Sequence, residues 1–122
     1  MLCAGNCNSK YLMKKIYCFD IDGIICKTRG NDYKNSKPNN QIIKRINQLY
    51  SEGNIIKIFT ARFMGRSDDN VRLAKKRGYK FTLKQLKKWK LKFHKLIFGK
   101  PSYHYIIDDR CLFFKKSFLK KI

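Results

Sequence analysis

Four of the eight acidic residues of this chain stand in two close pairs, and each pair follows an apolar run. Asp20 and Asp22 end the stretch YCFDID, and Asp108 and Asp109 end the stretch YHYIIDD. Short runs of β-branched and aromatic residues are typical of buried strands, so both pairs are expected at strand ends. Carboxylates that lie close together repel one another, and a hard cation with oxygen ligands relieves that repulsion. The pattern therefore predicts a carboxylate site for Mg²⁺.

Two further residues fit a phosphate site beside those acids. Thr60 ends a second apolar run, NIIKIFT, and Lys100 lies in FGKP just ahead of the strand expected at 103–108. A metal-bound carboxylate cluster flanked by a hydroxyl and an ammonium group can bind and activate a phosphoryl group. A third acidic pair, at 68–69, is expected in a first helical turn, where the helix dipole favours negative charge, and it is interpreted as structural.

The elements that must position these residues alternate along the chain. Strand patterns cover 14–20, 54–60, part of 92–101 and 103–108. Apolar spacing and capping residues predict helices from about 42 to 53, from 67 to 78 and onward from Thr82. This alternation predicts an α/β domain with a mainly parallel sheet, and ligands of such sheets bind beyond the carboxyl ends of the strands.

The chain of 122 residues is long enough for one domain, expected over 14–122 after an extension at 1–13. Its basic tail, about 111–122, is expected to form a helix on the sheet, with contact to an anionic membrane as the alternative. No run of about 18 apolar residues is present, so no transmembrane segment is expected. Five cysteines without paired CxxC knuckles favour a reducing compartment over structural zinc, and we expect a cytoplasmic protein.

The formal net charge is +21, from 29 Lys and Arg against 8 Asp and Glu. Such a charge favours an anionic partner, whether a nucleic acid, an anionic lipid or a phosphorylated substrate. The alternative is a charge with no specific polyanion partner.

Together these residues resemble the haloacid dehalogenase superfamily of phosphotransferases. The resemblance rests on DIDG at 20–23, IFTAR at 58–62, GKP at 99–101 and YIIDD at 105–109, in that order. It implies a Rossmann-like domain with a parallel sheet flanked by helices. The segment at 27–53 is too short for a sizeable cap domain. More narrowly, FTARFMGRS and KLIFGKPSYHYIIDD are similar to small stand-alone phosphatases associated with capsule or lipopolysaccharide synthesis.

The resemblance also implies a role for each residue of the motifs. Asp20 would be the nucleophile that forms an aspartyl-phosphate, and Asp22 the general acid and base. Mg²⁺ would be held by Asp20, the backbone carbonyl of Asp22 and Asp108, with Asp109 assisting. The phosphoryl oxygens would be bound by residues after the second and third strands, namely Thr60 with Ala61, and Lys100. The family commonly has Thr after DxDG, where this chain has Ile24.

Three functions remain open from the sequence. The first is a Mg²⁺-dependent phosphatase of a sugar phosphate or a similar small phosphorylated metabolite. The second is the same reaction on nucleotides or nucleic-acid ends, which the positive charge favours. The third is a noncatalytic basic protein that binds polyanions on the same fold. A site without a cap would be open or covered by a neighbouring subunit, so a homo-oligomer is also an expectation.

Overall fold

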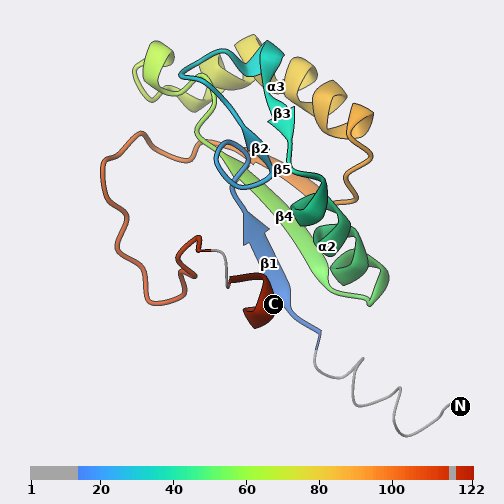
Figure 1. Cartoon of the computed structure of the whole chain (residues 1–122). Helices are drawn as coiled ribbons and strands as arrows, with labels where there is room; N and C mark the ends of the chain where they lie inside the picture. The colour runs from blue at the N-terminus through green and yellow to red at the C-terminus, as the bar shows by residue number, and fades with distance from the viewer. Residues whose placement is uncertain (1–13, 116–117) are drawn as a thin grey trace, which may run out of the picture.

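The computed structural model describes residues 14–115 and 118–122, and its centre is a parallel sheet with the strand order β1-β4-β5 (Figure 1). The strands are β1 (Ile16–Phe19), β4 (Ile55–Thr60) and β5 (Lys95–Phe98). Two helices, α2 and α3, accompany this sheet, and the described residues form no further domain. The predicted α/β class with a mainly parallel sheet is thus confirmed.

The strand register brings the carboxyl ends of the three strands to one edge of the sheet. Phe19 at the end of β1 pairs with Ile58, and Thr60 at the end of β4 pairs with Phe98 at the end of β5. Because the strands are parallel, the residues that follow each of them leave the sheet at the same edge. This edge is where the sequence motifs predicted the site.

Helix α2 (Asn40–Ser51) follows the apolar spacing seen in the sequence. Its N-cap is Asn39, whose side chain accepts a hydrogen bond from the backbone N–H of Ile42. The chain reverses after the helix at Gly53, whose φ of 95° suits a residue without a Cβ atom. The buried side of α2 joins the core through its four apolar residues, Ile42, Ile43, Ile46 and Leu49.

Helix α3 (Val71–Lys88) is one continuous helix where the sequence predicted two. Its N-cap is Asn70 and not Ser67, which lies in the short 3₁₀ turn η2 (Gly65–Ser67). Gly78 was expected to end a helix, but it lies in the middle of α3. A Cβ atom there would come within 2.2 Å of the Phe63 ring, so the glycine serves close packing. The predicted cap Thr82 is likewise buried within the helix.

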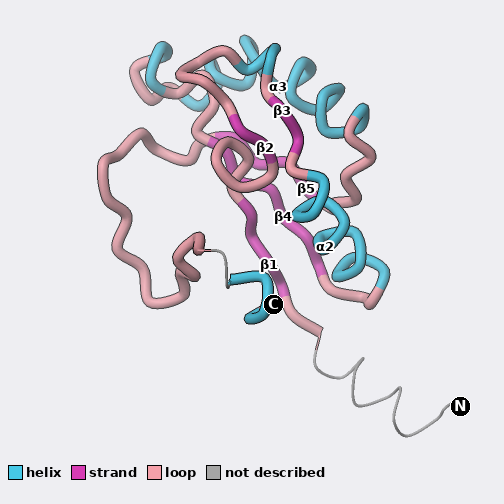
Figure 2. Tube along the Cα trace, viewed as in Figure 1, coloured by secondary structure: helices cyan, strands magenta, loops and turns pink. Residues whose placement is uncertain are grey.

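A small substructure takes the place of the loop expected at 27–40. Strands β2 (Cys26–Lys27) and β3 (Lys37–Pro38) pair antiparallel, and the 3₁₀ turn η1 (Tyr33–Asn35) lies between them (Figure 2). This hairpin is much smaller than a cap domain. It places Thr28 and Tyr33 near the carboxyl edge of the main sheet, where both contact residues of the candidate site.

The strand expected at 103–108 is not formed, and this prediction was wrong for the described structure. Residues 99–115 contain neither helix nor strand and extend as a long loop away from the sheet (Figure 1). Tyr105 and Ile107 in this loop are 86% and 94% exposed. Within the described residues, β1 pairs only with β4, so its second edge has no strand partner.

The ends of the chain partly follow the expectations. The 3₁₀ turn η3 (Phe118–Lys121) lies in the basic tail, and Phe118 is buried in the core cluster. The tail is therefore packed at one point, although Phe113 in the same tail is 80% exposed. The extension expected at 1–13 lies outside the described residues. Across the part of the chain that the structure describes, none of the helices has the length and apolar character needed to cross a membrane.

Candidate active site

The first half of the site is an ion pair between residues that follow two different strands. Asp20 comes directly after β1, and Lys100 comes two residues after β5. The Nζ of Lys100 lies 3.1 Å from Oδ2 of Asp20. The backbone N–H of Lys100 donates to the carbonyl of Thr60 at 3.2 Å, which fixes Lys100 at the end of β4. The shared sheet edge thus brings three of the sequence-predicted residues together.

The surroundings of this ion pair favour positive charge over negative charge. Burial raises the pKa of the Asp20 carboxyl, and the opposing effects of Lys100 and of the Ile21 N–H do not cancel it. Burial also acts to lower the pKa of Lys100, but a hydrogen bond with Tyr103 and the charge of Asp20 leave that pKa raised. The ionised form of Asp20 is therefore disfavoured by its surroundings, while the charged ammonium form of Lys100 is favoured.

The second half of the site is a buried arginine that holds Asp22. The Nε and Nη2 atoms of Arg62 donate to the two carboxylate oxygens of Asp22, each at 2.9 Å. The side chain of Arg62 is fully buried, whereas that of Asp22 is 27% exposed. The hydroxyl of Thr28 donates a third hydrogen bond to Asp22, at 2.5 Å. Bidentate pairing of this kind fixes the orientation of a carboxylate as well as its charge.

Further contacts secure the guanidinium group from its other sides. Nη1 of Arg62 donates to Oε1 of Gln85 at 2.7 Å, and Nε2 of Gln85 donates to the carbonyl of Tyr33 at 2.7 Å. The ring of Tyr33 stacks over the guanidinium, 4.7 Å from its centroid to Cζ. The thiol of Cys26 lies within 3.8 Å of Nη2. Residues from the turn after β1, from the hairpin and from α3 thus meet around one buried cation.

Thr60 is at the predicted strand end, but its hydroxyl is engaged within the protein. The side chain is fully buried, and its Oγ1 accepts a hydrogen bond from the backbone N–H of Arg62 at 3.0 Å. This contact shapes the turn that follows β4 and directs Arg62 toward Asp22. Ala61, between the two, is only partly buried. In this arrangement Thr60 supports the turn, and the partly exposed backbone at Ala61 is nearer to solvent.

Sequence reasoning did not identify Arg62 or Gln85 as site residues. Arg62 stood in IFTAR, directly after a buried strand, where a cation beside two carboxylates could have drawn attention. With 29 Lys and Arg in the chain, residue type alone gave no signal. Gln85 had no such signal, because a glutamine within a predicted helix does not show which residue of another segment it will contact.

The structure does not bring Asp108 or Asp109 to the site. Asp108 lies in the exposed loop, where its Oδ1 accepts a hydrogen bond from the Arg110 N–H at 2.9 Å. That bond, with another from Asp109, lowers the pKa of Asp108. Within residues 14–115 and 118–122, no three His, Cys, Asp or Glu side chains are arranged to hold a metal ion. Asp20 and Asp22 are paired with Lys100 and Arg62, so the described donor set does not fit the expected Mg²⁺.

Comparison with solved structures supports the fold. The chain is similar to a structural-genomics target from Vibrio cholerae, whose crystal structure matches with a TM-score of 0.76. The match has 24% sequence identity and covers 89% of this chain and 95% of that one. At this identity the likeness shows a shared architecture and nothing about activity. No family model and no curated protein matches the chain.

Proposed function

We propose that this chain is a phosphomonoester hydrolase of the haloacid dehalogenase type, with Asp20 as its nucleophile. The observation that carries the proposal is the pairing of Asp20 with Lys100 at the carboxyl edge of a parallel sheet, 3.1 Å apart. A nucleophilic carboxylate needs a cation beside it, because the attacked phosphoryl group is itself negatively charged. The order of DIDG, IFTAR and GKP along the chain adds the resemblance as a second support.

The proposed reaction has two steps. An Asp20 carboxylate oxygen forms a bond to phosphorus while the ester P–O bond breaks, and Asp22 gives a proton to the leaving oxygen. Water then attacks the phosphorus of the aspartyl-phosphate, Asp22 takes its proton, and inorganic phosphate and free Asp20 are restored. Lys100 offsets the charge of the phosphoryl oxygens, assisted by the backbone at Ala61.

This chemistry requires a rearrangement around Asp22. Both of its oxygens accept hydrogen bonds from Arg62, and one of them also accepts from Thr28. To exchange a proton with the leaving group or with water, Asp22 must give up one of these contacts. Arg62 then acts as a positioning residue that holds Asp22 two residues beyond the nucleophile.

Mg²⁺ is part of the proposal only if Asp108 moves to the site beside Asp20. Asp108 can reach Asp20 only if 103–108 forms the strand that the sequence predicted and this strand pairs with the open edge of β1. Two observations support that pairing: the edge of β1 has no partner among the described strands, and Tyr105 and Ile107 are exposed apolar residues that pairing would cover. No step of the reaction above is assigned to the metal.

A phosphate-release screen across sugar phosphates, nucleotides and phosphorylated oligonucleotides tests the proposal. We expect turnover by the wild-type chain and a loss on the order of 10³-fold or more in Asp20→Asn, since removal of a nucleophile abolishes the covalent route. Asp32→Asn is the matched control, because Asp32 is exposed and contacts only its own turn, at Asn35. Equal activity of Asp20→Asn and the wild type would refute the proposal. No turnover of any substrate would favour the noncatalytic alternative.

Magnesium dependence is tested in the same assay. If 103–108 pairs with β1 and brings Asp108 to Asp20, chelation should abolish turnover and added Mg²⁺ should restore it. Mg²⁺ with inorganic phosphate should then slow amide hydrogen exchange at 103–108. Full activity with chelator present would remove the metal from the proposal and leave Asp20 in place. The preference for a sugar phosphate comes from the resemblance alone.

A further inference from the structure

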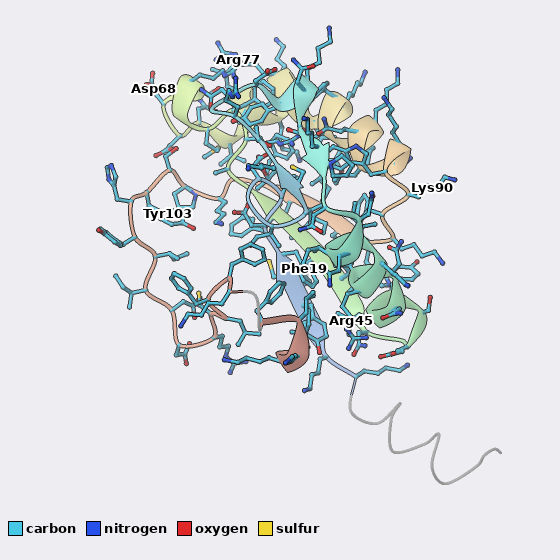
Figure 3. All side chains as sticks on the ribbon, in the orientation of Figure 1. Phe19, Arg45, Asp68, Arg77, Lys90 and Tyr103 are labelled. Atoms are coloured by element: carbon cyan, nitrogen blue, oxygen red, sulfur yellow. The ribbon has the colours of Figure 1, made fainter. Side chains whose placement is uncertain are left out.

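A regular row of cations winds along the exposed surface of α3. Arg72, Lys76, Lys80, Lys84 and Lys88 recur at every fourth residue, and all five are exposed. Neighbours in such a row are about 6 Å apart along the helix axis, so the row extends about 24 Å. Figure 3 shows nitrogen-tipped side chains of this helix projecting away from the body of the molecule. We call these five residues the α3 row.

Nothing among the described residues neutralises the α3 row. The sequence of α3 contains no Asp or Glu, and the ion pairs of the described residues all lie elsewhere, at Arg45–Glu52, Arg62–Asp22 and Lys100–Asp20. Like charges four residues apart on a helix destabilise it. The α3 row therefore repeats an unfavourable interaction four times without a compensating contact in the fold. A bound polyanion would remove that repulsion.

One aromatic side chain, Tyr79, lies among the first cations of the row, and its ring also packs against Phe98 with centroids 5.6 Å apart. An open groove of about 750 Å³ is lined by Arg72, Lys76 and Lys80 of the row together with Lys75 and Tyr79. The Tyr79 ring lies 5.5 Å from the Lys75 ammonium. Phe81, on the same helix, is 37% exposed. Cations that follow a phosphate backbone, with aromatic rings on which bases stack, are typical of single-stranded nucleic-acid binding.

The α3 row begins beside the candidate active site. A Cβ atom at Gly99 would lie 3.2 Å from both Cγ atoms of Val71, so the start of α3 packs against the residue that precedes Lys100. Arg72, the first member of the row, follows Val71 directly. A strand bound along α3 would therefore have one end near Lys100 and Asp20.

We infer that the α3 row binds the phosphate backbone of a single-stranded nucleic acid whose terminal phosphate enters the site at Asp20. The part of the inference that concerns the substrate rests on the proposed phosphatase function, and the part that concerns binding rests on α3 alone. A single row of cations fits one backbone, and the half-buried Tyr79 ring beside its first members suits an unpaired base. It makes a nucleic-acid end, and not a sugar phosphate, the substrate class.

Binding is tested with the inactive Asp20→Asn chain and a fluorescent single-stranded oligonucleotide, by anisotropy across a salt series. The row variant Lys76→Gln, Lys80→Gln, Lys84→Gln is compared with Lys44→Gln, Lys92→Gln, Lys95→Gln, which removes three exposed lysines elsewhere. We expect the row variant to bind on the order of tenfold more weakly and its salt slope to fall by about 2. Equal losses in both variants, or tighter binding to anionic vesicles than to the oligonucleotide, would overturn the inference.

Turnover by chains with Asp20 intact separates this inference from the proposed function. The row variant is expected to lower kcat/KM for a phosphorylated oligonucleotide about tenfold through KM, and to leave hydrolysis of p-nitrophenyl phosphate unchanged. Oligonucleotide binding without hydrolysis of any substrate would sink the proposed function and keep α3 as a binding surface. Hydrolysis of small phosphates with equal oligonucleotide kinetics in both variants would sink the inference and keep the phosphatase.

Discussion

Asp22 and Asp108 stand in similar sequence, each within an acidic pair after an apolar run, but they have opposite surroundings in the structure. Asp22 accepts hydrogen bonds from Arg62 and Thr28 within a packed layer. Asp108 lies in an exposed loop and accepts a bond from a backbone N–H two residues away. The comparison indicates that an apolar run followed by acidic residues forms a strand in this protein where a neighbouring strand pairs with it and a cation pairs with the acid. β4 and Arg62 supply both for the first pair.

The largest expected effect on stability comes from removing the partner of Asp22. Arg62→Gln should lower the free energy of unfolding by about 3 kcal/mol, because it removes the buried partner of Asp22 and leaves Gln85 without its donor. Urea unfolding measures the change. Arg29→Gln is the control, since Arg29 is exposed and should change stability by less than about 0.5 kcal/mol. Equal effects of the two variants would mean that Arg62 does not hold the site together.

The two regions also carry a cysteine each, and their reactivities should differ by roughly tenfold or more. Cys26 is 2% exposed within the Arg62 layer, and burial raises the pKa of its thiol, so little reactive thiolate is present. Cys111 lies exposed in the loop three residues after Asp108. Timed alkylation with iodoacetamide, followed by peptide mass mapping, should find Cys111 modified before Cys26. Similar rates would contradict the packed environment described for Cys26.

The carboxyls of Asp20 and Asp108 should titrate on opposite sides of their ordinary pKa of 3.8. Burial raises the pKa of Asp20, so its protonated form is favoured by folding. Its contribution to stability is fully present below pH 3.8 and is lost as the pH rises through the raised value. The backbone hydrogen bond lowers the pKa of Asp108. Carboxyl ¹³C shifts followed against pH, with chelator present, measure both, and a reversed order would contradict these environments.

The smallest expected effect is at Asp108, where a substitution should leave the stability of the fold unchanged. Asp108→Asn should leave the midpoint of urea unfolding where it is, because the side chain is exposed and contacts only its own turn. The same variant should lose phosphatase activity if 103–108 joins the sheet during turnover. A lowered midpoint in the absence of Mg²⁺ and phosphate would show that Asp108 is already packed, and would erase the contrast with Asp22.

Local sequence patterns predicted the elements that depend on apolar spacing and on single turn residues. The strands ending at Phe19 and Thr60 and the helix closed by Gly53 followed from apolar spacing and one turn residue each. Asp20 and Lys100 were expected at one site from the sequence motifs, and the ion pair between them is a finding of the structure. These features depend on local sequence patterns and on the rule that parallel strands end at the same edge of a sheet. Both can be read from a single sequence.

The remaining features depended on packing between segments far apart in the chain. Gly78 was interpreted as a helix end because nothing in the sequence indicates that Phe63 packs against it. Arg62 was missed since its partners come from the hairpin and from α3, at Thr28 and Gln85. The strand at 103–108 was expected from composition, which cannot say whether the edge of β1 receives it.

The contact between Gly78 and Phe63 sets a limit on how this protein can be improved by design. Alanine is the better helix former, by about 1 kcal/mol, and a designer would choose it at the centre of α3. Its methyl group would displace the Phe63 ring, which lies 5.1 Å from the ring of Tyr33, the ring that in turn covers Arg62. One added carbon at position 78 would thus change the packing around Arg62 and the position of Asp22, which Arg62 holds.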